Sequence, residues 1–175
     1  MTYLQVVNKV LTRLREDNVT TVAENSYSRL IGEFVNDART AVEDAWDWTA
    51  LRTTLTVTTQ ASVFNYSLTG SGNRVKVLDV VNDTDNFFMD YKSSHDFNNY
   101  FLNQDPVEGS PKWFSWNGVN ASGDAAVDVF PVPSGEYSLR FNVVLRNEDL
   151  VADADVIAVP NLAVVQLATA MGARE

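Results

Sequence analysis

Residues 25–48 read NSYSRLIGEFVNDARTAVEDAWDW, and this stretch predicts one long amphipathic helix. Apolar side chains recur at the i, i+3 and i+4 positions that place them on one helix face. At 100° per residue they span roughly a 160° arc, which we expect to be buried. The residues of this arc are Leu30, Ile31, Phe34, Val35, Ala38, Ala41, Val42, Ala45 and Trp46.

The opposite side of this helix is acidic, with Glu33, Asp37, Asp44 and Asp47 inside roughly an 80° arc. We call these four residues the acidic stripe. Such a stripe is usually a solvated helix face. The functional alternative is a negatively charged channel wall past which DNA slides. Arg29 precedes Glu33 by one helical turn and is expected to neutralise part of the stripe.

Two further helices are predicted near the ends of the chain. Residues 2–17 have Thr2 as a candidate N-cap, and the short connection to the long helix predicts antiparallel packing of the two. After Pro160 the sequence NLAVVQLATAMGARE is apolar on nearly every side, which predicts a buried helix. Because it reaches Glu175 without a C-terminal cap, we expect further helical sequence to follow.

The central part of the chain has the period-two pattern of β-strands. Strands are predicted over 51–59, 62–68, 75–81, 87–91, 112–117, 125–130 and 137–145, with Ser94 capping a short helix and a loop at 104–111. The sequence therefore predicts an α+β fold. Residues 1–50 and 158–175 would form a helical bundle, and residues 51–157 an inserted antiparallel β domain, either a sandwich or barrel-like.

Composition limits the classes of partner. The 175-residue chain carries 23 acidic and 13 basic residues, a net charge of −10, so its surface should repel duplex DNA. It contains no cysteine, which excludes disulfides and thiolate metal ligands. We expect no membrane span and no secretory leader, because no apolar run has the required length or setting.

No catalytic, cofactor or metal site is expected. The single histidine, His95, is interpreted as a surface or capping residue. Gly70 and Gly72 precede a strand rather than a helix, which indicates a hairpin turn and not a phosphate-binding loop. Asp83 and Asp85 alternate as calcium ligands do, but the glycine and distal glutamate of a calcium loop are missing, which favours a solvated turn.

The four tryptophans form two pairs. Trp46 is expected in the core, and Trp48 at the junction with the β region. Trp113 and Trp116 are three residues apart on a strand, so their side chains should point to opposite faces. One of them is expected in the core, and the other is a candidate subunit contact or sugar-stacking platform.

The order of motifs resembles a known family. Residues 109–114 read GSPKWF, residues 127–133 read VDVFPVP and residues 137–141 read YSLRF, after which Val159 and Pro160 open the apolar helix. Upstream lie the amphipathic helix, ending in AWDW at 45–48, and a β-rich run. This arrangement resembles the head-to-tail adaptor proteins of tailed bacteriophages, including the tail tubular protein A type of short-tailed phages.

The resemblance implies a structural virion protein at the head-tail junction, assembled in the host cytoplasm. Such adaptors form a ring, commonly dodecameric, beneath the portal protein. The ring extends the DNA channel and offers a platform to a tail nozzle or tail tube protein. The acidic stripe would line the channel, genomic DNA would pass without specific binding, and Trp48, Trp113 and Trp116 would be candidate subunit or partner contacts.

The alternative function is a β-rich carbohydrate-binding module of a phage or bacterial surface protein, with Trp113 or Trp116 as its platform. An enzyme ranks third, because the sequence offers no nucleophile–base pair or metal-ligand set.

Overall fold

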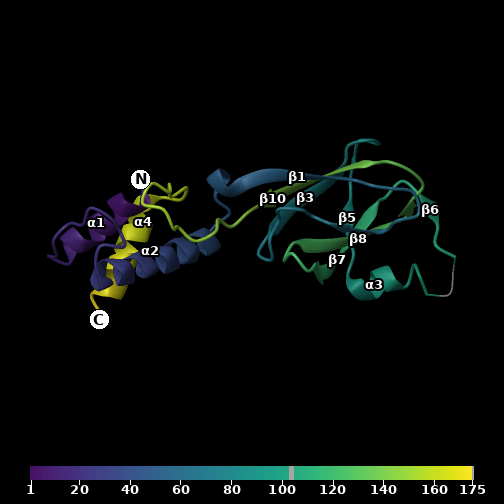
Figure 1. Ribbon diagram of the computed structural model, residues 1–175. Coiled ribbons are helices and arrows are strands. Elements are labelled where there is room, and N and C mark those ends of the chain that lie inside the picture. Colours follow the sequence, from purple (N-terminus) through teal and green to yellow (C-terminus); the bar gives the residue numbers. More distant parts are fainter. Residues whose placement is uncertain (103–104, 175) are drawn as a thin grey trace. The chain divides into compact units, whose positions relative to one another are not determined.

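The computed structural model describes residues 1–102 and 105–174, so Gln104, the first residue of the expected loop at 104–111, lies outside the described residues. The chain divides into two compact units (Figure 1). One comprises Met1–Leu51 and the chain from Arg146 onward, and the other comprises Arg52–Leu145. Within the first unit, residues 153–157 pair with the N-terminus: Tyr3 N donates to Asp155 O (2.8 Å).

Of the four α-helices among the described residues, the first unit contains three, α1 (Tyr3–Arg13), α2 (Ser26–Ala45) and α4 (Asn161–Gly172). Reciprocal hydrogen bonds between Thr2 and Gln5 cap α1, as the sequence predicts. Asn25 and Ser28 cap α2 in the same way. Helix α1 is shorter than expected, because the chain turns after Arg13 and Arg15 has a left-handed backbone (φ 65°).

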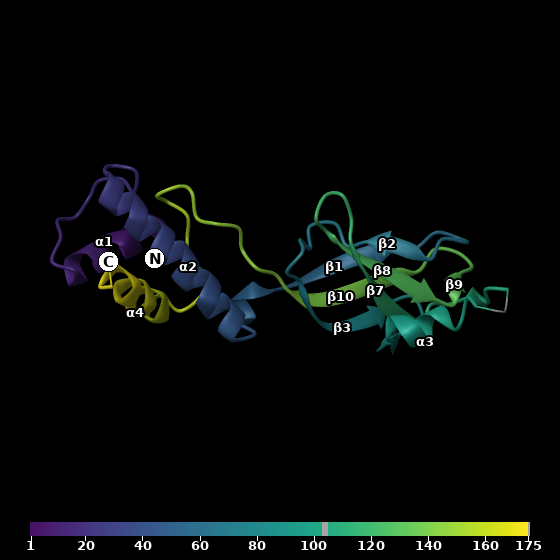
Figure 2. The same ribbon diagram turned by 90° about the horizontal axis from the view of Figure 1, so that it is seen from below.

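The three helices pack on one another (Figure 2). Most of the apolar side chains buried in them are small or branched. Gly172 of α4 lies where the helices meet: a Cβ there would be 2.8 Å from Leu14 Cδ1 and 3.1 Å from Ile31 Cδ1. The buried apolar residues of the three helices include Val6, Val7, Val10 and Leu11 of α1, Ile31, Val35 and Ala38 of α2, and Val164, Val165 and Ala168 of α4. Among the described residues, no helix is long and apolar enough to cross a bilayer.

The buried face of α2 differs from the predicted one. Trp46 is 68% exposed, so its assignment to the core is wrong. The helix ends at Ala45, and the extended backbone of Trp46 (φ −154°, ψ 157°) removes it from the apolar arc. Four polar residues of α2 are buried: Ser28 in the first turn, and further along Asn36, Arg39 and Glu43. Asn36, Arg39 and Glu43 share one side of the helix. They are covered by residues 146–150, which return from the β unit and which we call the return segment.

The second unit is built from two four-stranded sheets, with orders β1-β10-β3-β4 and β2-β8-β7-β5, and a short pair, β6-β9. These sheets are open, so the barrel-like alternative is wrong; with the four helices they confirm the α+β class. The strands are β1 (Arg52–Thr58), β2 (Asn65–Ser67), β3 (Lys76–Asn82), β4 (Phe87–Phe88), β5 (Asp90–Tyr91), β6 (Glu108–Gly109), β7 (Trp113–Val119), β8 (Ala125–Phe130), β9 (Val132–Pro133) and β10 (Ser138–Val144).

Two of the pairings are parallel, β5 with β7 and β6 with β9, where the sequence predicts an antiparallel domain. For β5 the reason is that the chain crosses between the sheets at Met89, after β4, and does not turn back as a hairpin. A short helix, α3 (Ser94–Asn98), follows β5. Its N-cap is Ser93 rather than the expected Ser94, with Asp96 N donating to the Ser93 hydroxyl.

The core of the β unit lies between its two sheets. Alternate residues of each strand point into it, as Val127 and Val129 of β8 do. Phe141 of the first sheet meets Phe114 of the second with ring centroids 6.3 Å apart. The buried set is Leu68, Val80, Met89, Phe114, Val127, Val129, Leu139, Phe141 and Val143.

Candidate interaction surfaces

The acidic stripe lies on the outer side of α2 and just beyond its end. Glu33, Asp37 and Asp44 are exposed, and Asp47 is half-buried. Asp44 forms an ion pair with Arg146 of the return segment, with Nε 2.9 Å from Oδ1. Arg29, expected to offset the stripe, forms no ion pair with Glu33 in the described part of the chain. The stripe is therefore a solvent-facing carboxylate surface of the single chain, with a cation beside Asp44.

Arg39 binds the return segment through its guanidinium group. Nη1 donates to the carbonyl oxygen of Glu148 (2.6 Å), and Nη2 donates to Asn147 O (3.4 Å) and to Asp149 Oδ1 (3.3 Å). These contacts replace the water that a buried cation loses. Arg39 therefore fixes the main chain at the point where it returns from the β unit.

Glu43 and Asn36 extend this attachment in both directions along α2. Glu43 accepts hydrogen bonds from the main-chain N (3.3 Å) and the side-chain Nδ2 (3.2 Å) of Asn147. Asn36 exchanges two bonds with Leu150, accepting at 2.9 Å and donating at 3.2 Å. Arg146 also donates to the carbonyl oxygen of Glu43. The polar side chains of α2 thus form hydrogen bonds with the main chain of the return segment, as a neighbouring strand would.

A pocket of about 320 Å³ opens beside this attachment, with the Tyr3 side chain in its wall. Burial, together with the negative charges of Glu33, Asp149 and Asp153, raises the pKa of Tyr3 to about 12. The phenol is therefore a neutral group in acidic surroundings. Among the described residues, no three His, Asp or Glu side chains are grouped so as to hold a metal ion.

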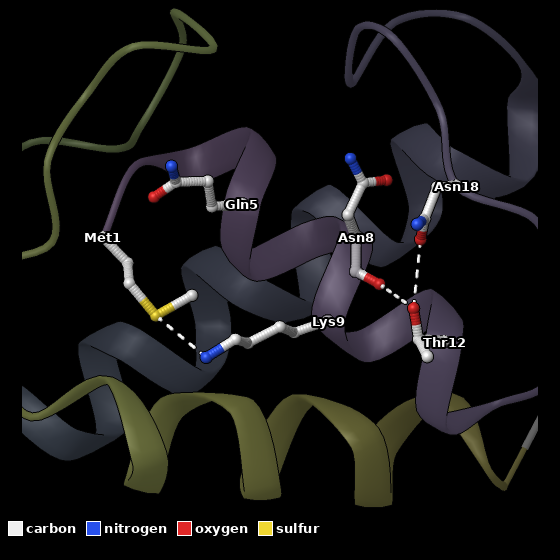
Figure 3. A pocket seen from close by; sticks show the side chains of 6 residues that line it. All are labelled: Met1, Gln5, Asn8, Lys9, Thr12 and Asn18. Atoms are coloured by element: carbon white, nitrogen blue, oxygen red, sulfur yellow. Dashed lines mark hydrogen bonds between the residues drawn. The ribbon is translucent and has the colours of Figure 1, made fainter.

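A second pocket, of about 400 Å³, lies against α1 (Figure 3). Its polar groups are engaged with one another: the Thr12 hydroxyl donates to Asn8 O (2.8 Å) and to Asn18 Oδ1 (3.0 Å). Asn8 exchanges two further bonds with the main chain of Val19. These contacts hold the α1–α2 connection against α1, which is a structural role.

The candidate tryptophans are all half-buried. Trp48 folds back on α2, where its Nε1 donates to Val42 O (2.7 Å). Trp113 stacks on Tyr100, which follows α3, with centroids 5.2 Å apart and an interplanar angle of 8°. Trp116 points to the other face, where it lies 6.4 Å from Phe141 at the margin of the core. The opposite orientations predicted for Trp113 and Trp116 are confirmed.

Sequence reasoning missed the polar residues that bind the return segment. Asn36, Arg39 and Glu43 lie at spacings of three and four, so they share one side of α2. Their periodicity was a usable signal, but polar residues on a helix ordinarily face water.

Comparison with known proteins gives a family match. The sequence matches the family model described as SU10 adaptor protein over residues 1–174, and so across both units. A search of curated proteins found no match.

Proposed function

Because the chain belongs to the SU10 adaptor protein family, a family of phage adaptor-type structural proteins, we propose that it forms a ring between the portal and the tail. The observation that carries this proposal is the extent of the family match, which includes the helical unit and the β unit alike. In this role the protein is a virion component at the head-tail junction and needs neither a catalytic centre nor a cofactor.

The proposed ring is dodecameric and of the tail tubular protein A type, with the portal on one side and a nozzle or tail tube protein on the other. Its helices α1, α2 and α4 act as the helical bundle expected from the sequence. Support comes from α4, which buries Val164, Val165 and Ala168 but leaves Leu162 62% exposed. An apolar side chain on the outer face of a short helix suits a contact between neighbouring subunits.

The acidic stripe is proposed to line the channel of this ring. Glu33 and Asp37 are exposed on α2 and would repel the phosphates of passing DNA. Weak attraction suits a conduit, since a wall that bound DNA tightly would slow its movement. The subunits would contact each other or their partners near Trp48, Trp113 and Trp116.

The test is to mix the full chain with the portal protein of the same phage and to measure mass by light scattering and shape by electron microscopy. We expect a ring stacked coaxially on the portal. A chain that remains monomeric alone and with the portal would contradict the proposal. The portal alone, and the chain mixed with an unrelated ring-forming protein, are the controls.

A further inference from the structure

The β unit has one side at which neither sheet is completed. On the first sheet, β4 covers only the end of β3, with Val81 opposite Phe88 and Asn82 opposite Phe87. In the described part of the chain, no strand continues this pairing along residues 77–79 of β3. Those residues, which include an irregularity at Leu78 where the register with β10 shifts, therefore present main-chain donors and acceptors at a free edge.

The second sheet is incomplete on the same side. Strand β5 pairs with β7 only where Asp90 lies opposite Trp113 and Tyr91 opposite Phe114. No described strand continues along residues 115–119 of β7. Residues of β3 and of β7 line one cavity, so the two incomplete edges face the same space.

Two adjoining cavities, of about 330 and 290 Å³, follow this open side, and Trp116 lines both. We call them together the edge groove. The first is lined by apolar side chains that include Phe88, 72% exposed, and Tyr91, 56% exposed. The second is lined by Val75, Val77 and Val119. Exposed aromatic and branched residues in a continuous groove are typical of a binding surface.

The charged lining of the edge groove is acidic. Asp79 and Asp90 are among the residues that line the first cavity, and the described residues lining the two cavities include no lysine or arginine. Asp79 is held in place by Asn142 Nδ2, which donates to its carboxylate at 2.5 Å. A lining that contains both carboxylates and aromatic rings suits guanidinium or ammonium groups, which can pair with the first and stack on the second.

We propose that the edge groove binds an extended segment of a partner protein in which basic and apolar residues alternate. Such a segment would add a strand along 77–79 or 115–119 and place its side chains alternately into and out of the groove. Its basic residues would pair with Asp79 and Asp90. The net charge of −10 favours a different protein over a second copy as the occupant. This inference does not depend on ring formation.

The probe is a labelled synthetic peptide in which valine alternates with arginine, titrated with the full chain and followed by fluorescence anisotropy. We expect saturable binding that weakens as salt is added. A matched peptide with glutamate in place of arginine should bind at least about tenfold more weakly. Absence of binding by the arginine peptide, or equal affinity for both peptides, would overturn the proposal.

Substitutions then locate the binding. Phe88→Ala and Asp90→Asn each change an exposed side chain of the groove and should weaken arginine-peptide binding about tenfold. Val107→Ala and Asp105→Asn alter exposed residues of the same unit outside the groove and should leave binding unchanged. Equal effects of both sets would overturn the assignment.

Two further measurements distinguish the proposed partner segment from other possible occupants of the edge groove. If maltohexaose, but not the arginine peptide, binds and Phe88→Ala abolishes its binding, the groove is a carbohydrate site. If Phe88→Ala abolishes self-association measured by sedimentation, a second copy fills it. Either result would overturn the partner-segment proposal.

Discussion

Arg39 and Glu43 lie one turn apart on α2 with both side chains buried, and Arg39 Nε is 3.8 Å from Glu43 Oε1. At that distance the two groups share charge attraction but no hydrogen bond. Each makes its hydrogen bonds to the return segment, Arg39 to Glu148 O and Glu43 to Asn147. The two buried charged groups therefore have hydrogen-bond partners only while the return segment is in place.

We predict that Arg39→Ala lowers the free energy of unfolding of the helical unit by about 3–5 kcal/mol. The substitution leaves the buried Glu43 carboxylate without its neighbouring cation and removes the donor to the Glu148 carbonyl oxygen. Urea unfolding followed by the helical circular dichroism signal measures this loss. Arg140→Ala is the control: Arg140 pairs with Asp83 at 2.9 Å but is 42% exposed, so its loss should cost less than about 1 kcal/mol. Similar costs for both variants would refute the argument.

Gly32→Ala should destabilise the helical unit by about 1–3 kcal/mol. A Cβ at position 32 would overlap the Tyr3 hydroxyl and lie 2.8 Å from Val22 Cγ1. In the Tyr3→Phe background the overlap with the hydroxyl is removed, so the same substitution should cost less. Thermal unfolding of the four proteins of this cycle measures the difference. Gly135→Ala, with no atom within 4 Å of the new Cβ, should be nearly neutral, and an unchanged cost with Phe at position 3 would contradict the prediction.

The raised pKa of Tyr3 predicts a loss of stability in alkali. Below pH 10 the phenol is neutral in the folded and unfolded states and contributes no pH dependence. Between pH 10 and about 12 the unfolded chain releases this proton while the folded chain retains it, so the unfolding free energy falls, by up to about 2 kcal/mol. The Tyr3→Phe variant should show a shallower fall than wild type over this range. Tyr27→Phe, outside the pocket, is the matched control, and identical profiles for wild type and Tyr3→Phe would exclude the effect.

Charge reversal of the acidic stripe tests its proposed place in the channel. Phage carrying Glu33→Lys with Asp37→Lys should assemble a ring but release DNA more slowly, because the wall would now attract phosphates. Asp44 is left unchanged, since it pairs with Arg146. Asp105→Lys with Glu136→Lys gives the same change in net charge at exposed positions of the β unit. If DNA retention and ejection are unaltered while the ring remains intact, the proposal that the acidic stripe lines the channel is wrong.

Local signals were sufficient to predict where α1 and α2 begin and many of the strands. Thr2 and Asn25 are caps because their side chains meet main-chain donors three residues later, a relationship contained in a few neighbouring residues. Strand β8 occupies the predicted range, since Val127 and Val129 alternate with residues of the other face. Such features need no knowledge of distant parts of the chain.

The predictions of burial were wrong where segments distant in the sequence cover a residue. Asn36 is buried because Leu150 offers its main chain, more than a hundred positions away, and nothing near Asn36 in the sequence reveals that partner. Trp46 continues the apolar period of α2, yet the helix stops one residue before it. The edge groove was also missed, because it forms only where β3 and β7 of different sheets come together.

The chain leaves α2 through Thr49–Leu51 and returns at Arg146, which binds the main chain of Glu43 near the end of the same helix. The core of the β unit is made entirely from residues between these two points. In evolutionary terms the β unit is a continuous insertion that carries its own core. Recombination inside the gene can replace residues 52–145 without altering a helix–helix contact, provided that the incoming stretch ends in a segment that Arg39 and Glu43 can hold.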